Sequence, residues 1–157
     1  MANFNDLTSQ INSTATALEF FNTITFGQAD EIDLNRQGIF PILHIVPTNA
    51  SRDERTTSFT FEFHAYDLVD FNKDDIRDIQ EPFNGTDNLQ DVLNSMMLFL
   101  DILIDKFNRG TEFRDLFQVD LPVSCSPFFE TQSNKLAGWS ATISFRVPNS
   151  STTDGRC

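Results

Sequence analysis

Cysteine and histidine are scarce in this chain, which has two of each in 157 residues. Cys125 and Cys157 stand far apart in the sequence, and neither belongs to a Cys-x-x-Cys pair, the spacing that opens many zinc sites. The sequence therefore predicts two free thiols, with neither a disulfide framework nor a zinc centre.

Basic side chains are also few, because 11 lysines and arginines stand against 23 acidic residues and leave a net charge of -12. A surface of that sign repels phosphate groups, so we expect no specific binding of nucleic acid. The opening MANFNDLTSQ has no basic segment followed by an apolar one, and the apolar run at 95–100 ends at Asp101. We accordingly expect no signal peptide and no membrane span.

Motifs that carry catalysis are missing as well: the chain has no G-x-S-x-G, no phosphate-binding P-loop and no G-x-G-x-x-G. His44 and His64 fall on neighbouring predicted strands, but a metal would need a third ligand such as Glu62 or Asp67. Asp67 would point away from the face of His64. We therefore expect no enzyme, no catalytic residue, no cofactor and no metal. One alternative stays open, a small-ligand-binding α+β module or enzyme with a Phe-lined pocket, in which His64 is the polar group.

Phenylalanine, by contrast, is abundant, with 17 residues against one tyrosine and one tryptophan. Its ring has no hydrogen-bonding group, so this composition favours core filling over polar recognition. The length suits one hydrophobic core. The sequence therefore predicts a single domain over residues 1–157.

Alternating apolar residues predict the strands of a sheet. In LAGWSATISFRVPN, residues 136–149, apolar side chains occupy every second position, which is the period of a half-buried strand. Residues 59–65 alternate in the same way, and the polar segment 47–57 before them predicts the long link of a hairpin. The remaining strands are expected at 39–46, beginning at Pro41, at 113–119 and at 123–129.

Apolar residues at steps of three and four predict two helices. The first is expected over residues 1–22. The second is expected to begin near Asp87 and Gln90, which have the spacing of a capping box, and to end before Gly110.

The apolar stripe of the second helix is wider than contact with one sheet requires, because Val92, Phe99 and Ile102 flank it. These three residues are the candidates for contact with another chain. The alternative, that they complete the core of the domain, remains open at this stage.

The order of elements favours the α+β class, with a mostly antiparallel sheet flanked by two main helices on one face. Two segments are expected to lie outside this core: an exposed acidic loop at 70–86 and a mobile polar tail at 149–157.

Three blocks of the sequence are distinctive in combination with the terminal Cys157. Residues 31–50 contain the F-P-x-x-H-I strand, residues 84–113 contain the helix start GTDNLQDVLN, and residues 125–149 contain LAGW and end in VPN. In these blocks the chain resembles small virion proteins of tailed bacteriophages, the neck and tail-completion proteins that include tail terminators and connector rings.

The resemblance implies a tail-terminator-like α+β fold without catalytic residues. It further implies a homo-oligomeric ring, a hexamer or a dodecamer, around the DNA channel of the head-tail neck, in contact with adjacent neck, portal-adaptor or tail proteins. The protein would be found in the virion and, before assembly, in the host cytoplasm. A tail-tube or tail-tip ring would fit the same features. In either ring, acidic residues such as those between Asp70 and Glu81 are expected to line the bore, where they would let DNA slide without sticking.

Overall fold

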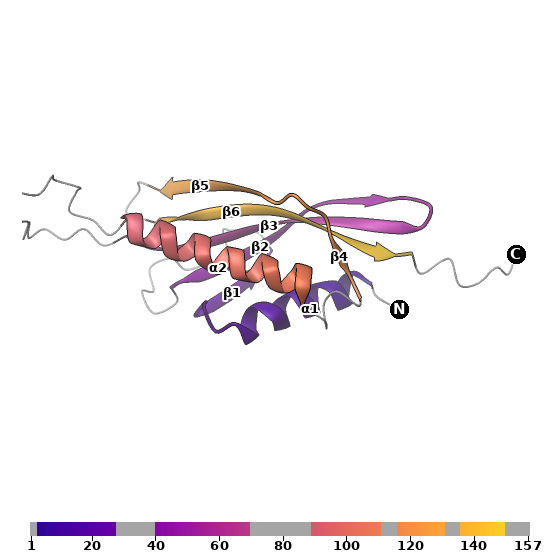
Figure 1. Ribbon diagram of the computed structural model, residues 1–157, viewed down its shortest axis with the longest axis horizontal. Helices are drawn as coiled ribbons and strands as arrows, with labels where there is room; N and C mark the ends of the chain where they lie inside the picture. The colour runs from indigo at the N-terminus through magenta and orange to yellow at the C-terminus, as the bar shows by residue number, and fades with distance from the viewer. Residues whose placement is uncertain (1–2, 28–39, 70–88, 111–115, 131–135, 150–157) are drawn as a thin grey trace, which may run out of the picture.

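A mostly antiparallel sheet with two helices on one face makes up the described part of the chain (Figure 1). The computed structural model describes residues 3–27, 40–69, 89–110, 116–130 and 136–149. The α+β class predicted from the sequence is confirmed. In chain order the elements are α1 (Phe4–Ala17), β1 (Thr23–Phe26), β2 (Ile42–Arg52), β3 (Thr56–Leu68), α2 (Leu89–Arg109), β4 (Gln118–Val119), β5 (Ser124–Glu130) and β6 (Leu136–Pro148).

The strands lie in the order β1-β2-β3-β6, and β4 and β5 both pair with the outer side of β6. Only β1 is parallel to its neighbour, β2, and every other pair is antiparallel. β5 follows the first half of β6, with Ser124 opposite Thr142, whereas β4 pairs near its end, with Val119 opposite Phe145. The two long central strands, β3 and β6, are thus enclosed on both sides, and β1 and the β4–β5 segment form the lateral edges.

Both helices cover the same face of the sheet (Figure 1). The alternation predicted for residues 59–65 is confirmed, because Phe61, Phe63 and Ala65 point into the helix layer and are fully buried. The alternate residues of β6, including Phe145, do the same. A slip of one residue in the pairing would turn these apolar side chains to the opposite face of the sheet. Their burial against the helices therefore fixes the register of the central strands.

Helix α1 begins with a capping box, in which Asn3 Oδ1 accepts a hydrogen bond from the Asp6 amide and Asp6 Oδ2 accepts one from the Asn3 amide, both at 3.0 Å. The helix predicted over 1–22 ends earlier, at Ala17. Glu19 has a φ of 56°, a left-handed backbone conformation that an α-helix does not continue through. Phe21 nevertheless reaches the core from beyond the helix.

The hairpin of β2 and β3 is longer than the sequence indicated. Residues 47–57 were expected as a link, but they are mostly strand, and only residues 53–55 form the turn. Asn149, which is 6% exposed, holds this turn in place with two hydrogen bonds. Its side-chain Nδ2 donates to the Asp53 carbonyl at 2.7 Å, and its backbone amide donates to the Arg55 carbonyl at 2.9 Å. The predicted mobile tail at 149–157 is therefore wrong at Asn149, and residues 150–157 lie outside the described part.

The other boundaries follow the sequence more closely. Pro41 directly precedes β2, and α2 ends before Gly110, as predicted. The strand expected at 123–129 is β5. Of the strand expected at 113–119 the described residues show only β4, since 111–115 are not described. Asp87 of the expected capping box and the expected acidic loop at 70–86 also lie outside the described residues.

Candidate interaction surfaces

The three interface candidates on α2 have different environments. Val92 is 6% exposed and belongs to the core, so the core alternative holds at that position. Phe99 is half-buried, with its ring stacked on Phe20 at 4.6 Å and edge-on to Phe21 at 5.7 Å. The Phe99 ring therefore packs against two rings of its own chain, and its role in contact with another chain stays a prediction. Ile102 is half-buried outside the core cluster, and its role in contact with another chain stays a prediction.

The apolar surface of the described residues instead lies at the two lateral edges of the sheet. Phe4 and Phe26 are exposed side by side at the β1 edge, with ring centroids 6.4 Å apart. Leu116, Leu121 and Phe129 are exposed along the opposite, β4–β5 edge. Leu98, on the outer surface of α2, is the one further large apolar side chain exposed in the described part. The exposure of Phe26 and Leu121 was not predictable from the sequence, because Phe26 lies in a four-residue strand and Leu121 beside a two-residue strand, which are too short for a periodic pattern.

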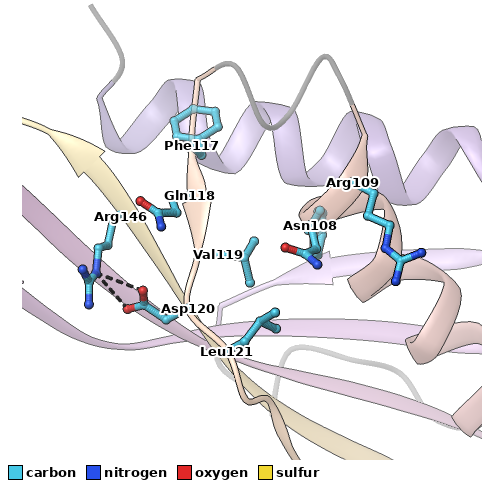
Figure 2. Close-up of a pocket in the computed structure, with 9 residues that line it drawn as sticks. Asn108, Arg109, Phe117, Gln118, Val119, Asp120, Leu121 and Arg146 are labelled. Carbon is cyan, nitrogen blue, oxygen red and sulfur yellow. Dashed lines mark hydrogen bonds and ion pairs between the residues drawn. The ribbon is translucent and has the colours of Figure 1, made fainter.

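A groove accompanies the β4–β5 edge (Figure 2). It has a volume of about 860 Å³ and runs between the end of α2, from Phe107 to Arg109, and the segment from Phe117 to Leu121. Figure 2 shows Val119 and Leu121 on one side and Asn108 and Arg109 on the other. Within this region Arg146 Nε contacts Asp120 Oδ1 at 2.9 Å, and Arg109 Nε contacts Asp105 Oδ1 at 3.2 Å. The cations near the groove therefore already have carboxylate partners.

A second groove, of about 290 Å³, lies at the β1 edge between α1 and β1. Its apolar lining comes from Ile11, Ile24, Phe26 and Ile45. Its polar lining is uncharged in the described residues and consists of Thr8, Ser9, Asn12 and Thr25. Both edges of the sheet thus combine a partly apolar groove with an exposed large apolar side chain.

Part of β2 has no neighbouring strand on its outer side among the described strands. β1 pairs with β2 only from Ile42 to Ile45, and no described strand pairs with the outer side of β2 beyond that point. Residues 47–52 are exposed on both faces. An unpaired strand edge offers hydrogen-bonding groups to another strand, although Pro47 and the irregular register between Pro47 and Asn49 limit how far such pairing extends.

The two histidines meet across the sheet, as their predicted strands implied. His44 is directly opposite His64, with ring centroids 6.4 Å apart. His64 Nδ1 bonds to Ser140 Oγ at 2.9 Å, and its Nε2 lies 3.3 Å from Glu62 Oε2. His44 is 2% exposed, and its Nδ1 shares a hydrogen bond of 2.6 Å with Thr25 Oγ1, while its Nε2 has no hydrogen-bond partner among the described residues. In the described part, no three His, Cys, Asp or Glu side chains are grouped to hold a metal ion.

Burial lowers the pKa of His44 below its ordinary value of 6.5, and the neighbouring His64 lowers it further, while the Gly27 backbone acts in the opposite direction. The unfolded chain therefore takes up a proton at this histidine at a higher pH than the folded chain does. Above pH 6.5 both states are neutral there, so the site adds no pH dependence. As the pH falls below that value, protonation of the unfolded state reduces stability.

We expect the free energy of unfolding to decrease as the pH falls below about 6.5, with a loss due to His44 that approaches about 1.4 kcal/mol per pH unit between its pKa values in the folded and unfolded chain. Urea unfolding at several pH values measures this, with His44→Gln as the comparison. The variant should lose less stability than the parent below pH 6.5. Parallel losses in the two proteins would show that His44 is not responsible.

Cys125 is the one cysteine that the structure describes, and it is a free, half-buried thiol on β5. Burial raises its pKa, and the negative charge of Asp101 on α2 adds to that effect. A thiol with a raised pKa is a poor nucleophile.

No helix among the described residues is long and apolar enough to cross a bilayer.

No protein-family model matches the chain, and no curated protein matches its sequence.

Proposed function

We propose that this chain is a structural virion protein of a tailed phage, which assembles into a ring at the head-tail neck as a tail terminator, tail-completion or connector protein. The observation that carries the proposal is the position of the exposed apolar side chains. Four of the six large ones in the described part, Phe26, Leu116, Leu121 and Phe129, lie on or beside the strands at the two opposite edges of one sheet. Apolar surface gathered in this way is typical of protein-protein contact.

The sequence blocks behind the resemblance also support the proposal, because they build the parts that such an assembly needs. They supply α2, β6 and most of β2 and β5, and so include one strand of the long hairpin and the exposed Phe129, whereas β4 and Leu121 lie outside them. The net charge of -12 suits a ring through which DNA passes without being held. A tail-tube or tail-tip ring would use the same contacts, and the position of the protein in the particle distinguishes these roles.

The ligand-binding alternative finds less support. The buried phenylalanines contact one another and leave no room for a ligand between them: the rings of Phe61 and Phe145 are 5.8 Å apart, and those of Phe107 and Phe145 are 5.3 Å apart. His64 lies on the sheet face opposite to Phe61 and Phe63, and therefore does not meet this cluster.

Multi-angle light scattering on the purified chain tests the proposal. We expect the mass of a hexamer or a dodecamer, in exchange with monomer at low concentration, because a ring that forms through many equal contacts assembles cooperatively. A chain that stays monomeric over the whole soluble concentration range would contradict it.

A further inference from the structure

We propose that neighbouring copies of this chain join through two different patches, the β1 edge of one copy against the β4–β5 edge of the next, with Phe26 and Leu121 at the centre of the contact. The inference rests on the proposed self-assembly and names the surfaces that would carry it. Phe26 is 48% exposed and Leu121 is 58% exposed, and each lines the groove of its own edge.

The two patches are suited to each other in shape. Each presents a half-exposed apolar side chain beside an open groove, whose apolar lining comes from Ile11, Ile24 and Ile45 at the β1 edge, and from Phe107, Phe117 and Val119 among polar residues at the β4–β5 edge. In the contact, Phe26 of one copy would enter the groove between α2 and β4, and Leu121 of the next copy would enter the groove between α1 and β1. A large apolar anchor that fills a pocket on the partner is the usual centre of binding energy in an interface.

Charge favours the same pairing, because neither edge would bury an unpaired ion among the described residues. The groove at the β1 edge has an uncharged polar lining, including Thr8 and Asn12. At the β4–β5 edge, Arg146 keeps Asp120 as its partner and Arg109 keeps Asp105. A buried charge that has lost its partner is strongly destabilising, and at this contact both arginines would keep their carboxylate partners.

The position of the patches points to a second copy as the occupant. They lie on opposite sides of one sheet, at β1 and along β4 and β5 (Figure 1). Since they are different, a symmetric dimer through either one would leave the other exposed. Contact between unlike patches repeats from copy to copy, and it closes into a ring when the rotation permits. One kind of contact therefore covers both apolar edges.

Two blocked variants and their mixture test this directly. Phe26→Asp leaves the β4–β5 edge intact, and Leu121→Asp leaves the β1 edge intact. Each variant alone should remain monomeric, with the dissociation constant of self-association raised at least about 30-fold. An equimolar mixture should form a 1:1 dimer and stop there, because each copy has one working patch. Sedimentation velocity distinguishes these species.

Leu98→Asp is the matched control, because Leu98 is 51% exposed on α2 and lies away from both grooves. It should assemble as the parent chain does. Thermal unfolding followed by circular dichroism checks that all variants are folded, and Phe26→Ser and Leu121→Ser replace any that are not.

The inference is overturned if either blocked variant assembles normally, if the mixture stays monomeric while the parent assembles, or if Leu98→Asp blocks assembly. These results would not contradict the proposed ring, which would then form through other contacts. Conversely, the mixture could form the 1:1 dimer while the parent chain forms open filaments. That result would support the pairing of the two edges and contradict the proposed ring. A parent chain that never associates would contradict both.

Discussion

Gly138→Val is expected to destabilise the fold by more than about 3 kcal/mol, a large share of the stability of a domain of this size. Gly138 lies on β6 directly opposite Tyr66 of β3. A Cβ atom at this position would overlap the Ala65 carbonyl oxygen and come within 2.7 Å of Tyr66 Cα. These are backbone atoms of the central strand, so no side-chain rotation relieves the clash, and the two longest strands must move apart.

The absent side chain also leaves room for an aromatic contact. Tyr66 on β3 and Phe128 on β5 are the two residues opposite Gly138, and their rings meet with centroids 5.7 Å apart. A valine between them would separate these rings as well. Aromatic residues that cover a glycine of a neighbouring strand are a known means of stabilising sheets.

Urea denaturation followed by the fluorescence of Trp139 measures the effect, since Trp139 joins β6 to α2 through a 2.9 Å hydrogen bond from its Nε1 to the Leu93 carbonyl. The control is Thr142→Ala, an exposed change on the same strand that should alter stability by less than about 0.5 kcal/mol. A Gly138→Val protein as stable as this control would show that β3 and β6 are not as close as described.

Phe145→Ala is expected to cost about 3–5 kcal/mol. Phe145 is fully buried on β6, and its ring contacts Phe61 at 5.8 Å, Phe63 at 6.3 Å and Phe107 at 5.3 Å. The cluster joins the two central strands to α2. Truncation would therefore remove apolar burial, leave a cavity and lose three aromatic contacts at once.

Phe129→Ala is the comparison for this change, because Phe129 is on the neighbouring strand but 56% exposed. In the dilute monomer it should change the free energy of unfolding by less than about 0.5 kcal/mol. Equal effects of the two substitutions, measured in the same urea titration, would contradict the assigned core. The pair also separates a loss of folding from a loss of assembly, because Phe129 belongs to the proposed contact edge and Phe145 does not.

The central strands and α2 were predictable because burial on one face imposes a period on the sequence. Phe61, Phe63 and Phe145 occupy the buried positions that the alternation indicated. The end of α1 was not predictable in this way, because Phe21 continues the apolar stripe although the backbone has left the helix at Glu19. The hairpin was missed for a related reason: residues 47–52 are exposed on both faces, so nothing alternates, and backbone hydrogen bonds hold them.

The candidate interface was predicted less well than the fold. The stripe of α2 is wide, but the sequence could not show that the core takes up Val92 or that Phe20 and Phe21 cover Phe99. Which apolar residue stays exposed depends on contacts between distant segments. Phe26 and Leu121 lie in a four-residue strand and beside a two-residue strand, where no periodicity can develop.

Electron microscopy of the assembled fraction tests the central claim, that this chain acts by closing into a ring. We expect ring-shaped particles with a central channel and a single rotational symmetry, hexameric or dodecameric. Two-fold dimers or particles without a channel would contradict it.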